Sequence, residues 1–298
     1  MSAILKVKNL NVTLTHQKTS EKLVKDVSFE VQPGECLGIL GESGSGKSMT
    51  VKSMLGLLDK NFQVSGSAVF DGHDLLKESK EELRRLRGSR ITMVLQNPMT
   101  CFDPLYRIGN QMAETFATHT TWNAQEIRSH CLKILIQMQI LNGEEVLQKY
   151  PHQLSGGMLQ RIMIGIAMAL QPELLIADEP TTAIDAITQY EILEEFIRIK
   201  KNKNTAMLFI THDLGAISKV ADRILVMNSG HIVDSGDFEH IRNHAQDPYT
   251  RFLIEKRSAA NSHNYYVIIH HFLPLLFTLL RKYLFHSSLP DKANHQIS

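Results

Sequence analysis

The stretch Gly41-Glu42-Ser43-Gly44-Ser45-Gly46-Lys47-Ser48 fits the pattern Gly-x-x-x-x-Gly-Lys-Ser/Thr. A continuous apolar run, Cys36–Leu40, precedes it, and a segment with helical spacing of apolar residues, Ser48–Leu58, follows it. A strand, a glycine loop and a helix start in this order let backbone N–H groups converge on phosphate oxygens, because no Cβ atoms obstruct them. The stretch therefore predicts a nucleotide phosphate site beside a strand that is buried on both faces.

The side chains of this loop have separate expected roles. Lys47 is placed to reach the β- and γ-phosphates, and the Ser48 hydroxyl is placed to bind Mg²⁺. A chance match in a glycine-bearing turn is the alternative, and the strand–loop–helix context disfavours it. The predicted phosphate-binding residues are Gly41, Glu42, Ser43, Gly44, Ser45, Gly46, Lys47, Ser48 and Met49.

A second buried run, Leu174–Ala177, ends in two carboxylates, Asp178 and Glu179. Open parallel sheets carry their chemistry at the C-terminal ends of strands. We expect Asp178 to hold Mg²⁺, through water, and Glu179 to orient and deprotonate an attacking water. The alternative is an exposed turn at a strand end, which the phosphate loop upstream disfavours.

Composition narrows the class of protein. The chain has 298 residues, 43% of them hydrophobic, which is enough to bury a core. Its 32 Lys and Arg residues against 31 Asp and Glu residues leave no basic excess, so we expect no nucleic-acid partner. Three cysteines without Cys-x-x-Cys spacing argue against a disulfide scaffold and a zinc ribbon. The N-terminus shows no secretory signal and no segment reaches about 20 apolar residues, so the expected body is soluble and cytosolic.

Strand-like and helical patterns alternate along the chain, which predicts a doubly wound α/β sheet. Between Thr121 and Tyr150 the pattern is helical with one apolar stripe, and this block is interpreted as an insertion. Other strand-like runs are Leu5–Val12, Val27–Val31, Ile91–Leu95, Ala206–Ile210 and Arg223–Met227, and another amphipathic stretch is Ile187–Lys201.

The segment Leu154-Ser155-Gly156-Gly157-Met158 precedes a helical run, Ile162–Leu170. With the motifs above, it makes the chain resemble the nucleotide-binding subunits of ATP-binding-cassette transporters over residues 3–255. The resemblance implies a P-loop NTPase core of the RecA-like type, with an antiparallel β subdomain and a helical subdomain inserted at about residues 97–160. It also implies that Leu154, Ser155, Gly156, Gly157 and Met158 of one subunit face the phosphate loop of another across ATP. The alternative for this segment is a helix-capping turn.

Three further residues match motifs of that family. The resemblance makes Gln96 the glutamine that senses Mg²⁺ and the γ-phosphate, Asp185 the aspartate that crosses the dimer interface, and His212 the histidine that contacts the γ-phosphate. The implied cofactors are ATP and Mg²⁺. The implied catalytic residues are Glu179, His212 and Gln96, and the implied Mg²⁺ ligands are Ser48, Gln96 and Asp178.

Finer features point to the peptide and nickel import branch of the family. The Leu-Ser-Gly-Gly-Met string, the extended stretch Gln96–Pro104 and the stretch Asp247–Arg251 are similar to that branch. Ser-Gly-Gly-Met-Leu-Gln-Arg is most similar to importers of nickel or metal chelates, and the alternative is an oligopeptide or dipeptide importer. The family's adenine-stacking aromatic residue is replaced by Leu14, with His16 close by.

Two other classes of function remain open: a soluble mechanoenzyme of the same superfamily, and a nucleotide-binding regulator without hydrolysis. The single motif set disfavours the first, and the presence of Glu179 and His212 disfavours the second. The importer hypothesis implies two membrane permeases, a second homologous ATPase subunit and a solute-binding protein as partners. It places the chain at the cytoplasmic face of the cell membrane as a peripheral protein.

The last part of the chain, residues 256–298, resembles nothing in the branch. It is interpreted as a linker, Lys256–His263, followed by an apolar-aromatic stretch, Tyr265–Phe285. An amphipathic segment packing on the body or at the membrane, or a poorly structured tail, are the alternatives. Its histidines show no metal-ligand spacing. They are His263, His270, His271, His286 and His295.

Overall fold

The computed structural model describes residues 2–16, 19–182, 184–201 and 205–256. The chain divides into two compact units, Met1–Thr250 and Arg251–Ser298, and the description below concerns the first. The interpretation of the tail beyond Lys256 therefore lies outside the described residues. Among the described residues, every helix is too short or too polar to span a lipid bilayer.

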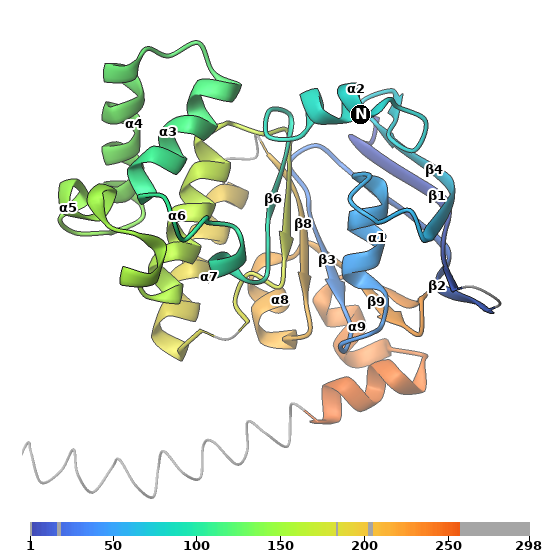
Figure 1. The fold of residues 1–298 in the computed structure, drawn as a ribbon. Coiled ribbons are helices and arrows are strands. Elements are labelled where there is room, and N and C mark those ends of the chain that lie inside the picture. Colours follow the sequence, from blue (N-terminus) through green and yellow to red (C-terminus); the bar gives the residue numbers. More distant parts are fainter. Residues whose placement is uncertain (1, 17–18, 183, 202–204, 257–298) are drawn as a thin grey trace, which may run out of the picture. The chain divides into compact units, whose positions relative to one another are not determined.

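A six-stranded sheet with the order β10-β9-β3-β8-β7-β6 forms the centre of this unit (Figure 1). The neighbours from β9 to β6 are parallel, whereas β10 pairs with β9 as an antiparallel hairpin. All residues of β3, β7 and β8 are buried, which is why these strands appear in the sequence as continuous apolar runs. The predicted α/β sheet is confirmed. Its strands are β3 Cys36–Leu40, β6 Ile91–Val94, β7 Leu174–Asp178, β8 Ala206–Thr211, β9 Arg223–Asn228 and β10 His231–Gly236.

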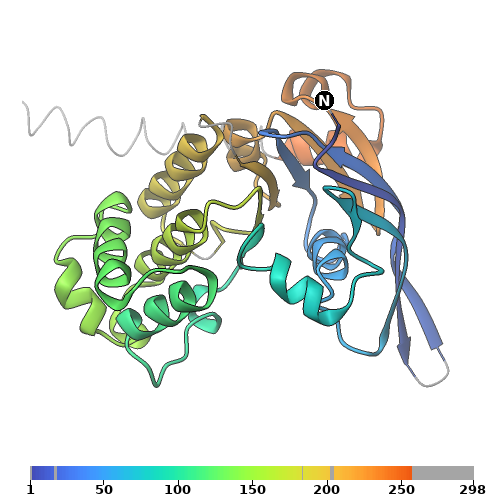
Figure 2. The ribbon, with the colours of Figure 1, turned by 90° about the horizontal axis from the view of Figure 1, so that it is seen from above.

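A second, antiparallel sheet has the order β2-β1-β4-β5. Its strands are β1 Leu5–His16, β2 Thr19–Val31, β4 Phe62–Phe70 and β5 His73–Asp74. The β1–β2 hairpin is longer than the runs predicted from alternation, because the first four residues of β2 are exposed and polar. One hydrophobic core joins the two sheets, and α1 lies between them (Figures 1 and 2).

Helices cover the six-stranded sheet and form a separate helical subdomain. The packing of α8 on β3 is close, since a Cβ on Gly38 would lie 2.6 Å from the Ile217 side chain. The helices are α1 Lys47–Met54, α2 Lys80–Leu86, α3 Ile108–His119, α4 Ala124–Gln137, α5 Gly143–Gln148, α6 Gly156–Ala169, α7 Ala186–Lys201, α8 Leu214–Val220 and α9 Phe238–His244, with short 3-10 helices at Pro98–Thr100 and Pro151–Gln153.

The helical subdomain consists of α3, α4 and α5 packed outside α6 (Figure 2). The apolar stripe predicted for α4 is buried, and Asn123 caps this helix by accepting the N–H groups of Gln125 and Glu126. The helix α3 starts before the helical block that was predicted from Thr121, and it buries its own stripe of Ile108, Met112 and Phe116. The helical part of the insertion is thus longer at its N-terminal side than the pattern indicated.

Candidate functional site

The phosphate loop connects the end of β3 to the start of α1. Gly44 and Gly46 have φ values of 82° and 102°, a backbone region that favours glycine. A Cβ on Gly46 would lie 3.0 Å from the carbonyl oxygen of Leu23. The first N–H groups of α1 have no carbonyl partner within the helix, so this helix start is suited to an anion.

Lys47 is buried beneath this loop, with 5% of its side chain exposed. Its Nζ donates to the carbonyl oxygens of Gly41 at 2.7 Å and Glu42 at 3.0 Å, and it lies 3.6 Å from Oε1 of Glu179. Burial lowers the pKa of this ammonium, and Glu179 opposes that effect. The loop carbonyls therefore fix the direction of a buried cation.

Ser48 and Asp178 meet beside Lys47. Ser48 Oγ donates to Asp178 Oδ1 at 2.7 Å, and burial raises the pKa of the Asp178 carboxyl. A hydroxyl and a carboxylate at one point are oxygen donors of the kind that Mg²⁺ takes together with phosphate oxygens. In the described part of the chain Ser45 Oγ is buried in the loop without a hydrogen-bond partner. The residues present therefore fit a magnesium–nucleotide complex.

Glu179 is held in an unusual backbone conformation, with φ of 50°. Its N–H donates to the carbonyl of Ile210 in the neighbouring strand β8 at 2.9 Å. Its Oε2 accepts from Thr182 Oγ1 at 2.9 Å and lies 2.7 Å from Nδ1 of His212. The sequence analysis did not predict that Thr182 donates a hydrogen bond to Glu179, although this threonine lies only three residues after Glu179.

These groups line one cavity of about 670 Å³. The cavity brings together all the phosphate-loop residues from Glu42 to Met49 with Gln96, Glu179 and His212. Leu23 of β2 also lines it, whereas Leu14, the residue expected at the adenine position, does not. The side chain of His16 lies outside the described residues. A hydrophobic contact from β2 was not predicted, because it depends on how the hairpin lies over the loop.

The segment Leu154–Met158 and Asp185 lie outside this cavity. Ser155 caps α6 by accepting the N–H of Met158 at 3.2 Å, and both Ser155 and Gly156 are exposed. Asp185 caps α7 by accepting the N–H groups of Ile187 and Thr188, and hydrogen bonds from Thr188 hold its pKa below the usual value. The single chain thus does not unite the two predicted halves of the nucleotide site.

The two capped helices nevertheless start side by side. A Cβ on Gly157 would lie 2.4 Å from Cγ2 of Thr188, so the first turns of α6 and α7 are in close contact. No group of three or more potential metal-ligating side chains occurs in the part of the chain that the structure describes. The tail histidines fall outside that part.

Comparison with known protein families identifies the family to which this phosphate loop and its neighbouring motifs belong. The model of the family described as ABC transporter matches residues 24–182, which include the phosphate loop, Gln96, the segment Leu154–Met158 and Glu179. The chain belongs to the ABC transporter family.

Curated relatives extend the match over most of the chain. The metal-staphylopine import system ATP-binding protein of Staphylococcus aureus is 45% identical over 260 residues, which cover 87% of this chain and 95% of that protein. The oligopeptide transport ATP-binding protein of Lactococcus lactis subsp. cremoris is 39% identical over 268 residues, which cover 89% and 79%. The chain is accordingly the ATP-hydrolysing subunit of an ABC importer.

Solved structures agree on the fold. A dimeric ATP-binding cassette in a post-hydrolysis state with ADP and phosphate has a TM-score of 0.70 at 24% identity, and covers 78% of this chain and 98% of its own. The predicted P-loop NTPase fold, with its antiparallel sheet and helical subdomain, is confirmed.

Proposed function

We propose that this chain hydrolyses ATP with Glu179 as the general base, and thereby drives import of a metal chelate. The observation that carries the proposed hydrolysis of ATP is the cavity beside the phosphate loop, which is lined by Lys47, Glu179 and His212. The metal chelate is supported by the metal-staphylopine importer subunit, which is 45% identical over 95% of its length. The oligopeptide subunit is 39% identical over 79% of its length, and a peptidoglycan transport ATP-binding protein of Agrobacterium fabrum is 44% identical over 46% of its length.

In this proposal the γ-phosphate takes the place of Glu179 as the partner of Lys47, which lies 3.6 Å from Oε1. Ser48, Asp178 and Gln96 are the residues that would hold Mg²⁺, which would supply a Lewis acid for the charge on the phosphate oxygens. Oε1 of Glu179 is then free to accept a proton from water, whose oxygen bonds to the γ-phosphorus as the bond to the β–γ bridging oxygen breaks. His212 and Thr182 hold the second carboxylate oxygen in place.

Replacement of Glu179 by Gln tests this role. Glu179→Gln keeps the shape of the side chain but removes the proton acceptor, so we expect steady-state ATPase activity to fall by about 100-fold or more. ATP binding should persist, and size-exclusion chromatography with ATP should show a trapped dimer. Lys47→Ala serves as the contrasting variant, because it should lose ATP binding itself. Turnover in Glu179→Gln close to that of the unmodified chain would contradict the role.

The exposed segment Leu154–Met158 is the second half-site in this proposal. Ser155 and the glycine N–H groups at the start of α6 form a helix N-terminus open to a phosphate. Because this segment does not reach the cavity of its own chain, it acts on the ATP of a second subunit. That subunit is a second copy or a sister ATPase.

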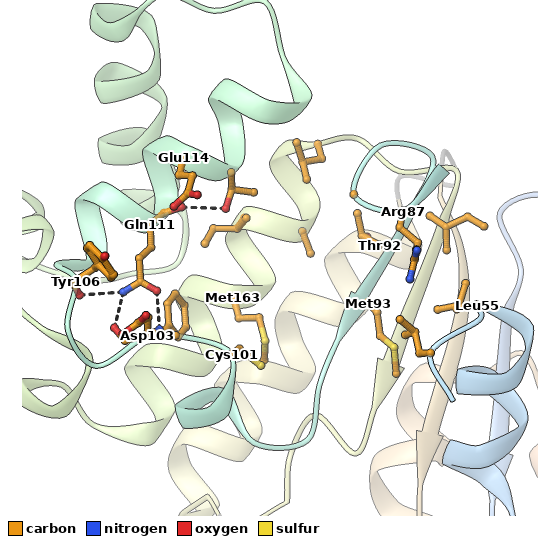
Figure 3. Close-up of a pocket in the computed structure, with 18 residues that line it drawn as sticks. Leu55, Arg87, Thr92, Met93, Cys101, Asp103, Tyr106, Gln111, Glu114 and Met163 are labelled. Carbon is orange, nitrogen blue, oxygen red and sulfur yellow. Dashed lines mark hydrogen bonds between the residues drawn. The ribbon is translucent and has the colours of Figure 1, made fainter. Parts of the chain in front are cut away.

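A groove between the helical subdomain and the edge of the six-stranded sheet is the proposed contact with a permease. Figure 3 shows Gln111 and Glu114 of α3 on one side of it, and Arg87 and Met93 on the other. Its volume is about 810 Å³, and it combines an apolar floor with acid groups on one wall and Arg87 on the other. An amphipathic helix of the permease fits this chemistry. The proposed location is therefore the cytoplasmic face of the membrane.

The solute is tested by uptake in a deletion strain. A strain without this chain should lose uptake of a radiolabelled transition metal supplied with its chelator, and retain uptake of a labelled oligopeptide. Loss of peptide uptake with unchanged metal uptake would favour the oligopeptide importer instead. A solute-binding protein that holds the chelate completes the proposed system.

A further inference from the structure

The segment after α9 contacts the phosphate loop at a position that no part of the proposed mechanism uses. The N–H of Glu42 donates to the hydroxyl oxygen of Tyr249 at 2.8 Å, across 207 residues of sequence. Both residues are partly buried. Tyr249 is therefore hydrogen-bonded to the second residue of the loop.

The peptide that Tyr249 holds is also the one that orients Lys47. The N–H of Glu42 and the carbonyl of Gly41 belong to one peptide plane, and in a trans peptide they point in opposite directions. Tyr249 binds the N–H side, and Lys47 Nζ donates to the carbonyl side at 2.7 Å. The two side chains clamp this peptide from its two edges.

Tyr249 is itself fixed by short hydrogen bonds. Its N–H donates to Asp247 Oδ1 at 2.8 Å, and the N–H of Asp247 donates to Oδ2 of Asp234 on β10 at 3.1 Å. A register shift in the β9–β10 pairing lies just before Asp234. The adjacent residue, Thr250, is fully buried. The backbone that carries the phenol is thus held from β10.

The same hairpin holds the loop at a second point. The N–H of Gly230, in the turn between β9 and β10, donates to the carbonyl of Ser45 at 3.0 Å. The loop is therefore fixed from the β9–β10 side at Glu42 and at Ser45, on either side of its apex. The hydrogen bond to Tyr249 therefore restricts rotation of the Gly41–Glu42 peptide.

We propose that Tyr249 is a positioning residue for ATP binding, which sets the Gly41–Glu42 peptide so that its carbonyl aims Lys47 at the phosphates. This inference rests on the proposed nucleotide site. It assigns a role in that site to the Asp-Pro-Tyr-Thr segment at 247–250, which lies far from the loop in sequence.

The test compares full-length Tyr249→Phe with the unmodified chain. Phe keeps the ring and removes the acceptor, so the Kd for Mg-ATP measured by calorimetry should rise about three- to tenfold. The KM for ATP should rise with it, while kcat stays within about twofold, because Glu179 and His212 are unchanged. Tyr190→Phe, which alters an exposed tyrosine on α7, should leave both constants unchanged. A kcat that falls while KM is constant would overturn the proposal.

Amide hydrogen exchange keeps the proposal testable even if Tyr249→Phe unfolds. The Glu42 amide of the unmodified chain should be protected, and in Tyr249→Phe its exchange should accelerate by about tenfold or more, with the β3 amides unchanged. Free exchange of the Glu42 amide in the unmodified chain would overturn the clamp. Lys47→Ala distinguishes the nucleotide site from the positioning role of Tyr249. If Lys47→Ala no longer binds ATP while Tyr249→Phe binds ATP normally, the positioning role is wrong and the nucleotide site is retained. If Lys47→Ala binds ATP normally, the nucleotide site fails.

Discussion

At the scale of single residues, the phosphate loop places different demands on its glycines. Gly44 has a positive φ, but a Cβ there would meet nothing within 4 Å. Gly46 has a φ of 102°, which is further from the region that other residues tolerate, and its Cβ would press on the carbonyl of Leu23. A side chain at Gly44 would therefore meet only an unfavourable backbone conformation, whereas a side chain at Gly46 would meet both that conformation and a steric clash.

This difference predicts unequal costs for two equivalent substitutions. Gly44→Ala should lower the free energy of unfolding by about 1 kcal/mol, which is the conformational cost alone. Gly46→Ala should lower it by about 2 kcal/mol or more, because the start of α1 or β2 must also shift. Denaturant unfolding of the two variants without nucleotide measures both values. Equal losses of unfolding free energy in the two variants would show that the chain around Leu23 shifts at no energetic cost.

The loop residues could be predicted because their spacing alone encodes the site. Thr182 and Tyr249 could not be predicted in the same way. Thr182 contacts Glu179 only because of the turn that follows β7, and Tyr249 reaches Glu42 only because β10 directs the chain back to the loop. The Tyr249 contact depends on the tertiary path of the chain and leaves no local pattern in the sequence, whereas the Thr182 contact depends on the geometry of a single turn.

At the scale of elements, the capped starts of α6 and α7 form one exposed surface. Ser155 and Asp185 satisfy the first N–H groups of the two helices, and Gly157 lets the helices approach at Thr188. The two motifs that were predicted to face a second subunit therefore lie together as a consequence of helix packing.

Adjacent glycines in this segment should respond differently to alanine. Gly157→Ala should destabilise the fold, because its Cβ would lie 2.4 Å from Thr188 and would force α6 from α7. Gly156→Ala should leave the unfolding temperature within about 2 °C, since a Cβ there meets nothing within 4 Å. If Gly156 approaches the phosphates of a second subunit, that variant should nevertheless lose ATPase activity. Thermal unfolding and steady-state ATPase assays separate the effects, and full activity in Gly156→Ala would argue against this approach.

The elements themselves were recovered unevenly from sequence. Fully buried strands such as β7 and β8 are unbroken apolar runs, which have few other interpretations. The helical pattern was recognised only from Thr121, although Ile108, Met112 and Phe116 of α3 recur at intervals of four; the resemblance alone placed this stretch in the helical subdomain. The hairpin β1–β2 was underestimated because its far end carries no hydrophobic alternation.

At the scale of the molecule, the C-terminal ends of the parallel strands bring distant motifs to one side of the sheet. The phosphate loop follows β3, Gln96 follows β6, Glu179 follows β7 and His212 follows β8. This convergence follows from the parallel topology, so the alternating pattern of the sequence was enough to predict it. The groove beside α3 was not predicted, since the sequence does not show how far the helical subdomain stands from β6.

The groove contains a natural probe for the permease contact. The chain has three cysteines, of which Cys36 and Cys131 are buried, while Cys101 is exposed and lines the groove. Partial burial raises the pKa of the Cys101 thiol, and burial raises that of Cys131 to about 11. Maleimide at pH 8 should therefore label Cys101 first in the isolated chain.

If a permease helix occupies the groove, assembly with the two permeases should slow maleimide labelling of Cys101 by about tenfold or more. Peptide mass spectrometry measures the labelling rate at each cysteine. Cys101→Ser should abolish the fast labelling, and slow labelling of Cys36 and Cys131 shows that the fold is intact. The Glu179→Gln chain with ATP, without permeases, is the matched control. Its Cys101 should stay reactive, because the groove does not include the segment Leu154–Met158, which is the proposed contact with the second subunit. Protection in that control would assign the groove to the ATPase dimer, whereas equal labelling with and without permeases would remove the groove from the transport interface.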